Sequence, residues 1–133
     1  MLRINAVDHL VFNVRNVEVS AEWYTRVLGM ERHDAQSPKG DTRTSMTFGS
    51  MKINLRPLAV SQEDWFTADH PEAGSQDLCF LTDMAPDEVA AHFRGLGVAI
   101  VTGPTAKSGA QGSIRSVYVR DPDGSLIEVS SYA

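Results

Sequence analysis

Hydrophobic and polar residues alternate over residues 7–14, which read Val-Asp-His-Leu-Val-Phe-Asn-Val. Leu10, Phe12 and Val14 share one side of an extended chain, and His9 lies on the opposite side. A period of two residues is typical of a strand with one buried face. The segment therefore predicts a strand that points a histidine away from its apolar side.

A helix is predicted directly after this strand. Asn16 can cap a helix that begins near Glu18, and Gly29 can end it in the left-handed conformation. The apolar residues of this segment recur at helical spacing and gather on one side: Val19, Trp23, Val27 and Leu28. A strand and a helix are thus expected within the first thirty residues.

The same pattern returns sixty-eight residues further on. Residues 77–81 predict a strand, Pro86 can start a helix, and Gly97 can end it. At this offset Leu10, Phe12, Arg26, Leu28 and Gly29 match Leu78, Phe80, Arg94, Leu96 and Gly97 identically. A shared spacing with shared residues indicates a duplicated module.

The ends of the two modules also correspond. Ile53-Asn54-Leu55 follows a predicted turn in the first module, and Ile127-Glu128-Val129 follows one in the second. Each module therefore predicts a strand, a helix and three strands, which makes an α+β fold with a curved mixed sheet and a concave cavity. The expected organisation is one domain over 1–133, with module one at about 5–56, a linker at 57–74 and module two at about 75–133.

Three glycines between Gly103 and Gly112 predict a loop. It is either a mobile loop that closes over the cavity or a plain exposed connector. A phosphate-binding loop is rejected, because Ala106 stands where that motif needs glycine before Lys107.

Composition narrows the class of function. The chain has 133 residues, 42% hydrophobic residues and a net charge of -5, which suits one domain and disfavours nucleic acid or anionic lipid as a partner. Cys79 is the only cysteine, so no disulfide forms within the chain. No apolar run is long enough for a membrane span or a signal peptide, and a cytoplasmic protein is expected.

The alternation along the strands places a set of polar residues on the same side of the sheet. His9, Asn54, Arg56, Asp77 and Glu128 have the parity opposite to the apolar residues of their strands. If both modules join their sheets edge to edge and curl, these side chains converge on the concave face. The pattern predicts a polar, concave site for a small molecule.

This combination resembles the vicinal oxygen chelate superfamily, which includes glyoxalase I, extradiol dioxygenases, and fosfomycin- and bleomycin-resistance proteins. The pieces that carry the resemblance are Asp8 to Phe12, Tyr24 to Gly29, Asp121 to Gly124, and Ile127 to Val129. The resemblance implies paired βαβββ modules, a divalent metal on the concave face, and frequently a homodimer with sites between modules of different subunits.

The resemblance also implies the metal ligands, because in metal-binding relatives they come from the first and last strands of each module. In this chain those positions hold His9, Asn54, Asp77 and Glu128. Asp77 stands where histidine is common, and Asn54 stands where a carboxylate or another stronger donor is common. An oxygen-rich set of this kind suits Mn²⁺, Fe²⁺, Ni²⁺ or Mg²⁺ more than structural Zn²⁺.

Two further residues are candidates for substrate binding. Arg56 either contacts a carboxylate or phosphate of the substrate or pairs with Asp77 and Glu128, which would leave no metal site. Tyr118 either contacts substrate, as a tyrosine near this turn does in fosfomycin-resistance relatives, or packs at the sheet surface. Both alternatives stay open at this point.

Three functions follow from these residues. The first is a glyoxalase-like, metal-dependent lyase or isomerase, in which Glu128 is a ligand and a possible base. The second is a bleomycin-resistance-type protein that binds a small molecule without catalysis. The third is an Fe²⁺ extradiol dioxygenase, which usually needs two histidines, whereas His9 is the one imidazole expected on this face.

Overall fold

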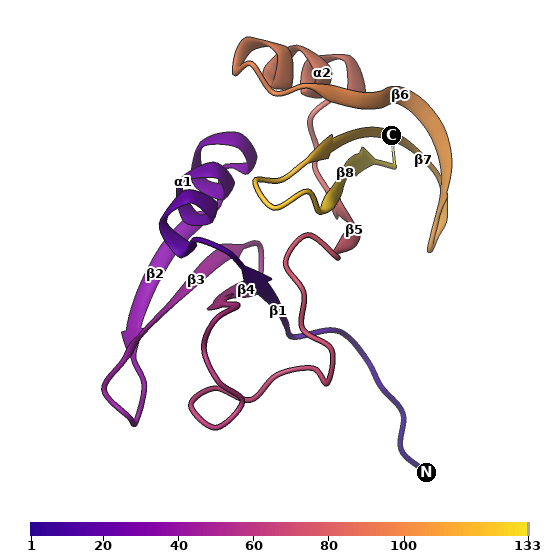
Figure 1. Ribbon diagram of the computed structural model, residues 1–133. Coiled ribbons are helices and arrows are strands. Elements are labelled where there is room, and N and C mark those ends of the chain that lie inside the picture. Colours follow the sequence, from indigo (N-terminus) through magenta and orange to yellow (C-terminus); the bar gives the residue numbers. More distant parts are fainter. Residues whose placement is uncertain (133) are drawn as a thin grey trace. The chain divides into compact units, whose positions relative to one another are not determined.

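The computed structural model describes residues 1–132, and the chain forms two compact units, unit 1 (residues 1–73) and unit 2 (residues 74–132). Each unit contains a strand, a helix and three further strands, in that order (Figure 1). The protein is therefore an α+β protein made of two tandem βαβββ modules, as the repeat predicted. Each module forms a mixed sheet of its own.

Unit 1 has a four-stranded sheet with the order β1-β4-β3-β2. The first strand runs parallel to the fourth, and the other neighbouring strands are antiparallel. Its elements are β1 (His9–Val14), α1 (Val17–Leu28), β2 (Glu31–Gln36), β3 (Thr42–Phe48) and β4 (Met51–Pro57).

Unit 2 repeats this arrangement with the strand order β5-β8-β7-β6. Its first strand again runs parallel to its last, and the other pairs are antiparallel. Its elements are β5 (Asp77–Leu81), α2 (Pro86–Gly95), β6 (Ile100–Gly109), β7 (Gly112–Arg120) and β8 (Leu126–Ser131).

The helix ends are those that the sequence predicted. The Asn16 side chain accepts a hydrogen bond from the Val19 amide at 3.1 Å, which satisfies a donor at the start of α1. Gly29 has φ 69° after α1, and Gly97 has φ 72° after α2, a conformation that glycine adopts without strain. No helix of the described residues is long and apolar enough to cross a membrane.

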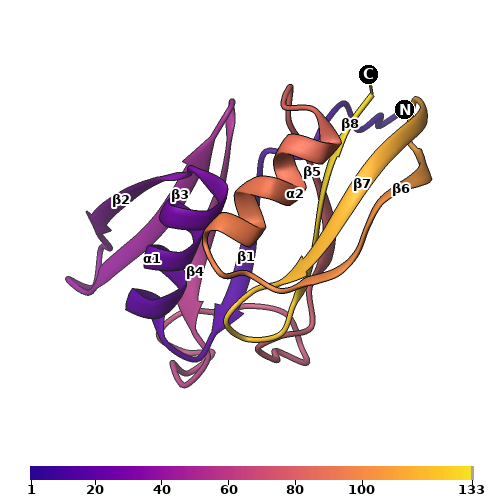
Figure 2. The same ribbon diagram turned by 90° about the horizontal axis from the view of Figure 1, so that it is seen from above.

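Each helix covers one face of the sheet of its own unit (Figure 2). In unit 1 the buried apolar residues include Phe12, Tyr24, Val27, Met46, Ile53 and Leu55. In unit 2 they include Val89, Phe93, Val117, Val119 and Ile127. Val19 was expected among them but is 51% exposed, because it lies on the flank of the helix face that Trp23, Tyr24 and Val27 bury.

The segment from Gly103 to Gly112 is not a loop, which corrects the sequence interpretation. It forms most of β6 and the tight connection to β7, and the two strands pair along their length. The register of this hairpin shifts on both sides of Thr102, and Gly103 lies in the second of these irregular intervals. A Cβ atom at Gly103 would lie 2.3 Å from the Ser116 carbonyl oxygen, so the glycine allows close approach of the two backbones.

Candidate functional site

In unit 1, two of the predicted ligands lie on the sheet face opposite α1. His9 in β1 pairs with Lys52 in β4, and Asn54 pairs with Val11, two residues further along. His9 and Asn54 are therefore diagonal neighbours on adjacent strands, with Cα atoms about 8 Å apart from standard strand spacings. Asn54 is partly buried and His9 is exposed.

The imidazole of His9 has a carboxylate partner. Its Nδ1 lies 2.8 Å from Asp8 Oδ2. A carboxylate at one ring nitrogen is the usual partner of a metal-binding histidine, because it orients the ring and leaves the other nitrogen as the ligand. In His9 that other nitrogen is Nε2. A hollow of about 340 Å³ lies beside this strand end and includes Asp8, Thr47 and Lys52.

In unit 2, the other two predicted ligands have the same diagonal relation. Asp77 in β5 pairs with Leu126 in β8, and Glu128 pairs with Cys79, two residues further along. The offset between Asp77 and Glu128 thus equals that between His9 and Asn54. Each unit brings two of the four predicted ligands to matching positions of its parallel strand pair.

Neither unit assembles a complete metal site by itself. Among the described residues, no group of three or more His, Cys, Asp or Glu side chains lies close enough to hold a metal ion. Of the other histidines, His33 pairs with Ser45, which pairs with Asn54, so His33 shares the polar face of unit 1. It lies two strands from Asn54, about 10 Å away, and does not add an imidazole beside it.

Glu128 is surrounded by hydroxyl groups. Ser116 donates to Oε2 at 2.5 Å, and Ser130 contacts the same oxygen at 3.3 Å. Tyr118 lies directly opposite Glu128 in the β7–β8 ladder. In the candidate site of unit 2, the partners of the Glu128 carboxyl group are therefore neutral hydroxyl groups rather than a cationic side chain.

Burial and the neighbouring Glu128 carboxylate raise the pKa of Tyr118 to about 12. The phenol is therefore protonated at neutral pH and can donate a hydrogen bond. Lys107 lies over its ring, with Nζ 5.7 Å from the ring centroid. Burial also raises the pKa of the Cys79 thiol; the hydrogen bond to Ser130 opposes this rise, and the field of Glu128 adds a smaller increase.

Arg56 is the largest fully buried side chain and is 1% exposed. Its Nε donates to the Trp65 carbonyl at 2.9 Å, and Nη1 donates to Asn13 Oδ1 at 2.7 Å and to the Pro57 carbonyl at 3.4 Å. Its Nη2 donates to the carbonyls of Val60 and Ser61 at 2.6 and 3.3 Å. Every N–H group of the guanidinium thus has an acceptor within unit 1, and burial lowers its pKa.

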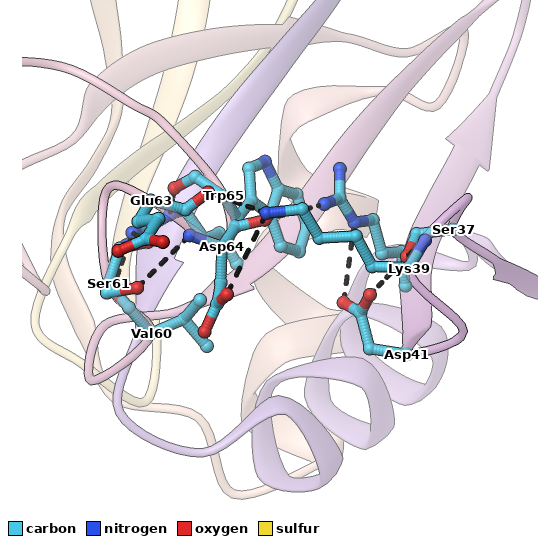
Figure 3. A network of polar contacts seen from close by, with 10 residues as sticks. Ser37, Lys39, Asp41, Val60, Ser61, Glu63, Asp64 and Trp65 are labelled. Atoms are coloured by element: carbon cyan, nitrogen blue, oxygen red, sulfur yellow. Dashed lines mark hydrogen bonds and ion pairs between the residues drawn. The ribbon is translucent and has the colours of Figure 1, made fainter.

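The contacts of Arg56 hold the start of the linker, which belongs to unit 1, against the sheet of that unit. Lys39, in the β2–β3 turn, donates to the Glu63 carbonyl at 2.7 Å and lies 3.8 Å from Asp64 (Figure 3). Arg43 stacks over the Trp65 ring, 4.2 Å from its centroid, and donates to the Asp64 carbonyl. Trp65 is consequently buried, as an aromatic anchor should be.

A family model described as the Glyoxalase/Bleomycin resistance protein/Dioxygenase superfamily matches residues 6–129. The chain belongs to this superfamily. It is 38% identical over 129 residues to the "Virulence protein STM3117" of Salmonella typhimurium, an alignment that covers 97% of this chain and 85% of that protein. It is 40% identical over 131 residues to the "Glyoxalase domain-containing protein RDO1" of Mycosarcoma maydis, covering 98% and 70% respectively.

Solved structures of similar proteins have the same fold. A protein from the mobile metagenome of V. Pseudocholerae superposes with a TM-score of 0.92 at 40% identity, covering 100% of this chain and 98% of that one. The crystal structure of STM3117 superposes with a TM-score of 0.89 at 37% identity, covering 99% and 100%. The resemblance inferred from the sequence motifs is confirmed.

Two residues of the site were missed by the sequence interpretation as functional candidates, namely Ser116 and Ser130. Both lie on the face that carries Glu128, because Ser116 has the parity of Tyr118 and Ser130 has the parity of Glu128. That parity was the available signal. Serine is so common on exposed strand faces that only the burial of these two hydroxyls distinguishes them.

Proposed function

We propose that the protein is a glyoxalase-like, metal-dependent lyase or isomerase that acts on a small, oxygen-rich substrate. The observation that carries this proposal is the matching placement of His9 and Asn54 in unit 1 and of Asp77 and Glu128 in unit 2. A duplicated fold that repeats the positions of its donor side chains gives each unit an equivalent pair of candidate ligands.

The donor set fits a divalent cation. One imidazole, one amide oxygen and two carboxylates suit Mn²⁺, Fe²⁺, Ni²⁺ or Mg²⁺, and the contact between His9 and Asp8 leaves Nε2 for coordination. A bound cation would supply Lewis-acid stabilisation of negative charge on neighbouring substrate oxygens.

The side chains of unit 2 supply the proton chemistry in this proposal. Glu128 takes a proton from the substrate carbon, because hydroxyl groups already hold its carboxylate in place. Tyr118 remains protonated and donates a hydrogen bond to a substrate oxygen, since its pKa lies near 12.

The role of Arg56 in binding an anionic group stays a prediction. A substrate could gain a hydrogen bond from Arg56 only in exchange for one of its contacts with the linker or Asn13. We therefore assign Arg56 primarily the role of holding the linker in place. A preference for anionic substrates is therefore not required by the proposal.

A second candidate function is the binding of a small molecule without catalysis. It is favoured by the fact that the Glu128 carboxylate is satisfied by hydroxyl donors within its own unit. A carboxylate with such partners is stable without a cation. Asn54, a weak metal ligand, agrees with this candidate as well.

Metal binding separates the two candidates. Protein purified without chelator is analysed for metals, and the metal-free protein is titrated with Mn²⁺ while free Mn²⁺ is followed by electron paramagnetic resonance. We expect stoichiometric binding that His9→Ala and Glu128→Gln weaken strongly and that the exposed-site control Ser113→Ala leaves unchanged. Failure of the wild-type protein to bind Mn²⁺, Fe²⁺, Ni²⁺ or Mg²⁺ would eliminate the metal-dependent lyase and leave the binding protein.

A further inference from the structure

We propose that Ser116 and Ser130 are positioning residues for Glu128, which together hold one oxygen of its carboxylate and set the direction of the other. The inference rests on the proposed function in so far as Glu128 is the ligand and base. The arrangement itself lies entirely within unit 2, on three neighbouring strands.

The four side chains occupy a square on the β7–β8 ladder. Ser116 is directly opposite Ser130, and Tyr118 is directly opposite Glu128. Residues two apart on a strand share a face, so all four side chains point to the same side of the sheet. Cys79 in β5 is opposite Glu128 on its other side.

Burial shows that the two hydroxyl groups are not ordinary surface serines. Ser116 is 0% exposed and Ser130 is 1% exposed, whereas Ser113 on the same strand β7 is exposed. A buried hydroxyl without a partner destabilises the fold by about 1–3 kcal/mol. Both hydroxyls avoid this loss by bonding each other at 2.7 Å and by bonding Glu128.

Each hydroxyl has one proton, and this determines the direction of the chain of hydrogen bonds. Ser116 uses its proton for Glu128 Oε2 and so accepts from Ser130, whose single proton is shared between Ser116 Oγ at 2.7 Å and, more weakly, Glu128 Oε2 at 3.3 Å. Ser130 in turn accepts from the Cys79 thiol, with 3.2 Å between Sγ and Oγ. The chain runs from Cys79 through Ser130 and Ser116 to Glu128, and each bond polarises the next.

As a consequence, the two carboxylate oxygens of Glu128 differ in their contacts. Both serine contacts are made to Oε2, so Oε1 is the oxygen left for a cation or a substrate proton. A ligand held in this way loses little freedom when it binds, and removal of such a supporting group typically weakens metal binding about 10–100-fold. Ser116 is the stronger of the two supports, because its contact with Oε2 is the shorter one.

The first test is structural and needs no metal. Crystal structures of the Ser116→Ala and Ser116→Ala/Ser130→Ala variants are compared with the wild type. We expect the Glu128 carboxylate to leave its wild-type position in both variants and to keep it in Ser113→Ala. A second control is Ser20→Ala, which removes a hydroxyl that is also buried but has no hydrogen-bond partner among the described residues. An unmoved Glu128 carboxylate in the double variant would overturn the proposal.

The second test measures Mn²⁺ binding with the same proteins. Ser116→Ala and Ser130→Ala should raise the dissociation constant for Mn²⁺ about 10–100-fold, while Ser116→Thr, which keeps the hydroxyl, should recover at least part of the affinity. A merely structural role would lower the melting temperature and leave the affinity unchanged. Wild-type affinity in both alanine variants, in a protein whose binding Glu128→Gln abolishes, would refute the positioning role while the proposed function survives.

The two proposals can fail separately. If the wild-type protein binds none of the divalent ions, the proposed function is lost, and the crystal structures still decide whether the serines position Glu128. If Ser116→Ala does not fold, Ser130→Ala provides the same two measurements, because its hydroxyl is the donor to Ser116.

Discussion

Arg56 shows how one residue can connect the sheet to the linker. Its parity put it correctly on the polar side of β4, next to Asn13. Four of its five contacts are with backbone carbonyls of the segment from Pro57 to Trp65. A buried guanidinium is stable here because it satisfies carbonyls that would otherwise be buried without a donor.

Replacement of Arg56 should therefore destabilise unit 1 and loosen the linker. We expect Arg56→Met to lower the free energy of unfolding by several kcal/mol, on the order of 3, because the methionine leaves the linker carbonyls and Asn13 unsatisfied. Urea unfolding gives the free energy, and hydrogen exchange should show faster exchange in residues 57–67.

The matched control is Arg26→Met on the surface of α1. Arg26 is exposed and makes one ion pair with Glu22 at 2.8 Å, so its replacement should change stability by less than about 1 kcal/mol. Equal effects of the two substitutions would contradict the assignment of Arg56 to the linker.

At the scale of elements, β2 is an edge strand whose six residues are all exposed. The stability of β2 therefore depends on its hydrogen bonds to β3 and on contacts between side chains at its surface. Arg32 forms a bidentate pair with Glu18 in the first turn of α1, at 2.6 and 2.8 Å, and also contacts Asp34. These contacts connect the edge strand to the helix and discourage pairing with other chains.

This network predicts an acid-dependent loss of stability. The hydrogen bond from Arg32 lowers the pKa of Glu18, and hydrogen bonds from Thr44 and then Arg32 lower the pKa of Asp34. Because both pKa values are depressed in the folded protein, the contribution is present above the ordinary carboxyl pKa of about 4 and is lost as the pH falls below it. Thermal unfolding of wild type and Arg32→Gln between pH 7 and pH 3 measures this contribution to stability.

We expect Arg32→Gln to lose less stability than the wild type over this pH range. The control is Arg120→Gln, which removes the same charge from a side chain that bonds the Gly124 carbonyl instead of a carboxylate. If the stabilities of wild type and Arg32→Gln fell in parallel with pH, the contacts of Arg32 with Glu18 and Asp34 would make no pH-dependent contribution to folding. High salt should reduce the difference, since these groups are exposed.

At the scale of the whole molecule, large apolar side chains remain uncovered. Near the amino terminus, Leu2 and Ile4 are 83% and 79% exposed and Val7 is 58% exposed; on the linker, Phe66 is 85% exposed. Clustered apolar residues on a surface favour association with another protein surface. The superfamily resemblance makes a second copy of this chain the expected partner.

We therefore predict a homodimer that depends on the amino-terminal apolar residues. Sedimentation at micromolar concentration should show two chains per particle for the wild type, and Leu2→Ser/Ile4→Ser should shift the equilibrium toward the monomer. Val19→Ser, at a 51% exposed site on α1, serves as the control. A monomeric wild type would rule out the dimer, and an unaffected dimer in the double variant would rule out the role of these residues.

The sequence by itself determined the duplicated modules, the helix ends at Asn16, Gly29 and Pro86, and the strand face that carries Glu128. These features depend on local rules of capping and two-residue periodicity, which residue types encode directly. Only the tertiary structure decided the partners of Arg56, the hydroxyl chain through Ser116 and Ser130, and the strand at Gly103. The partners of Arg56 are mostly backbone carbonyls, which every residue type has, and a buried serine or a paired glycine looks the same in sequence as an exposed one.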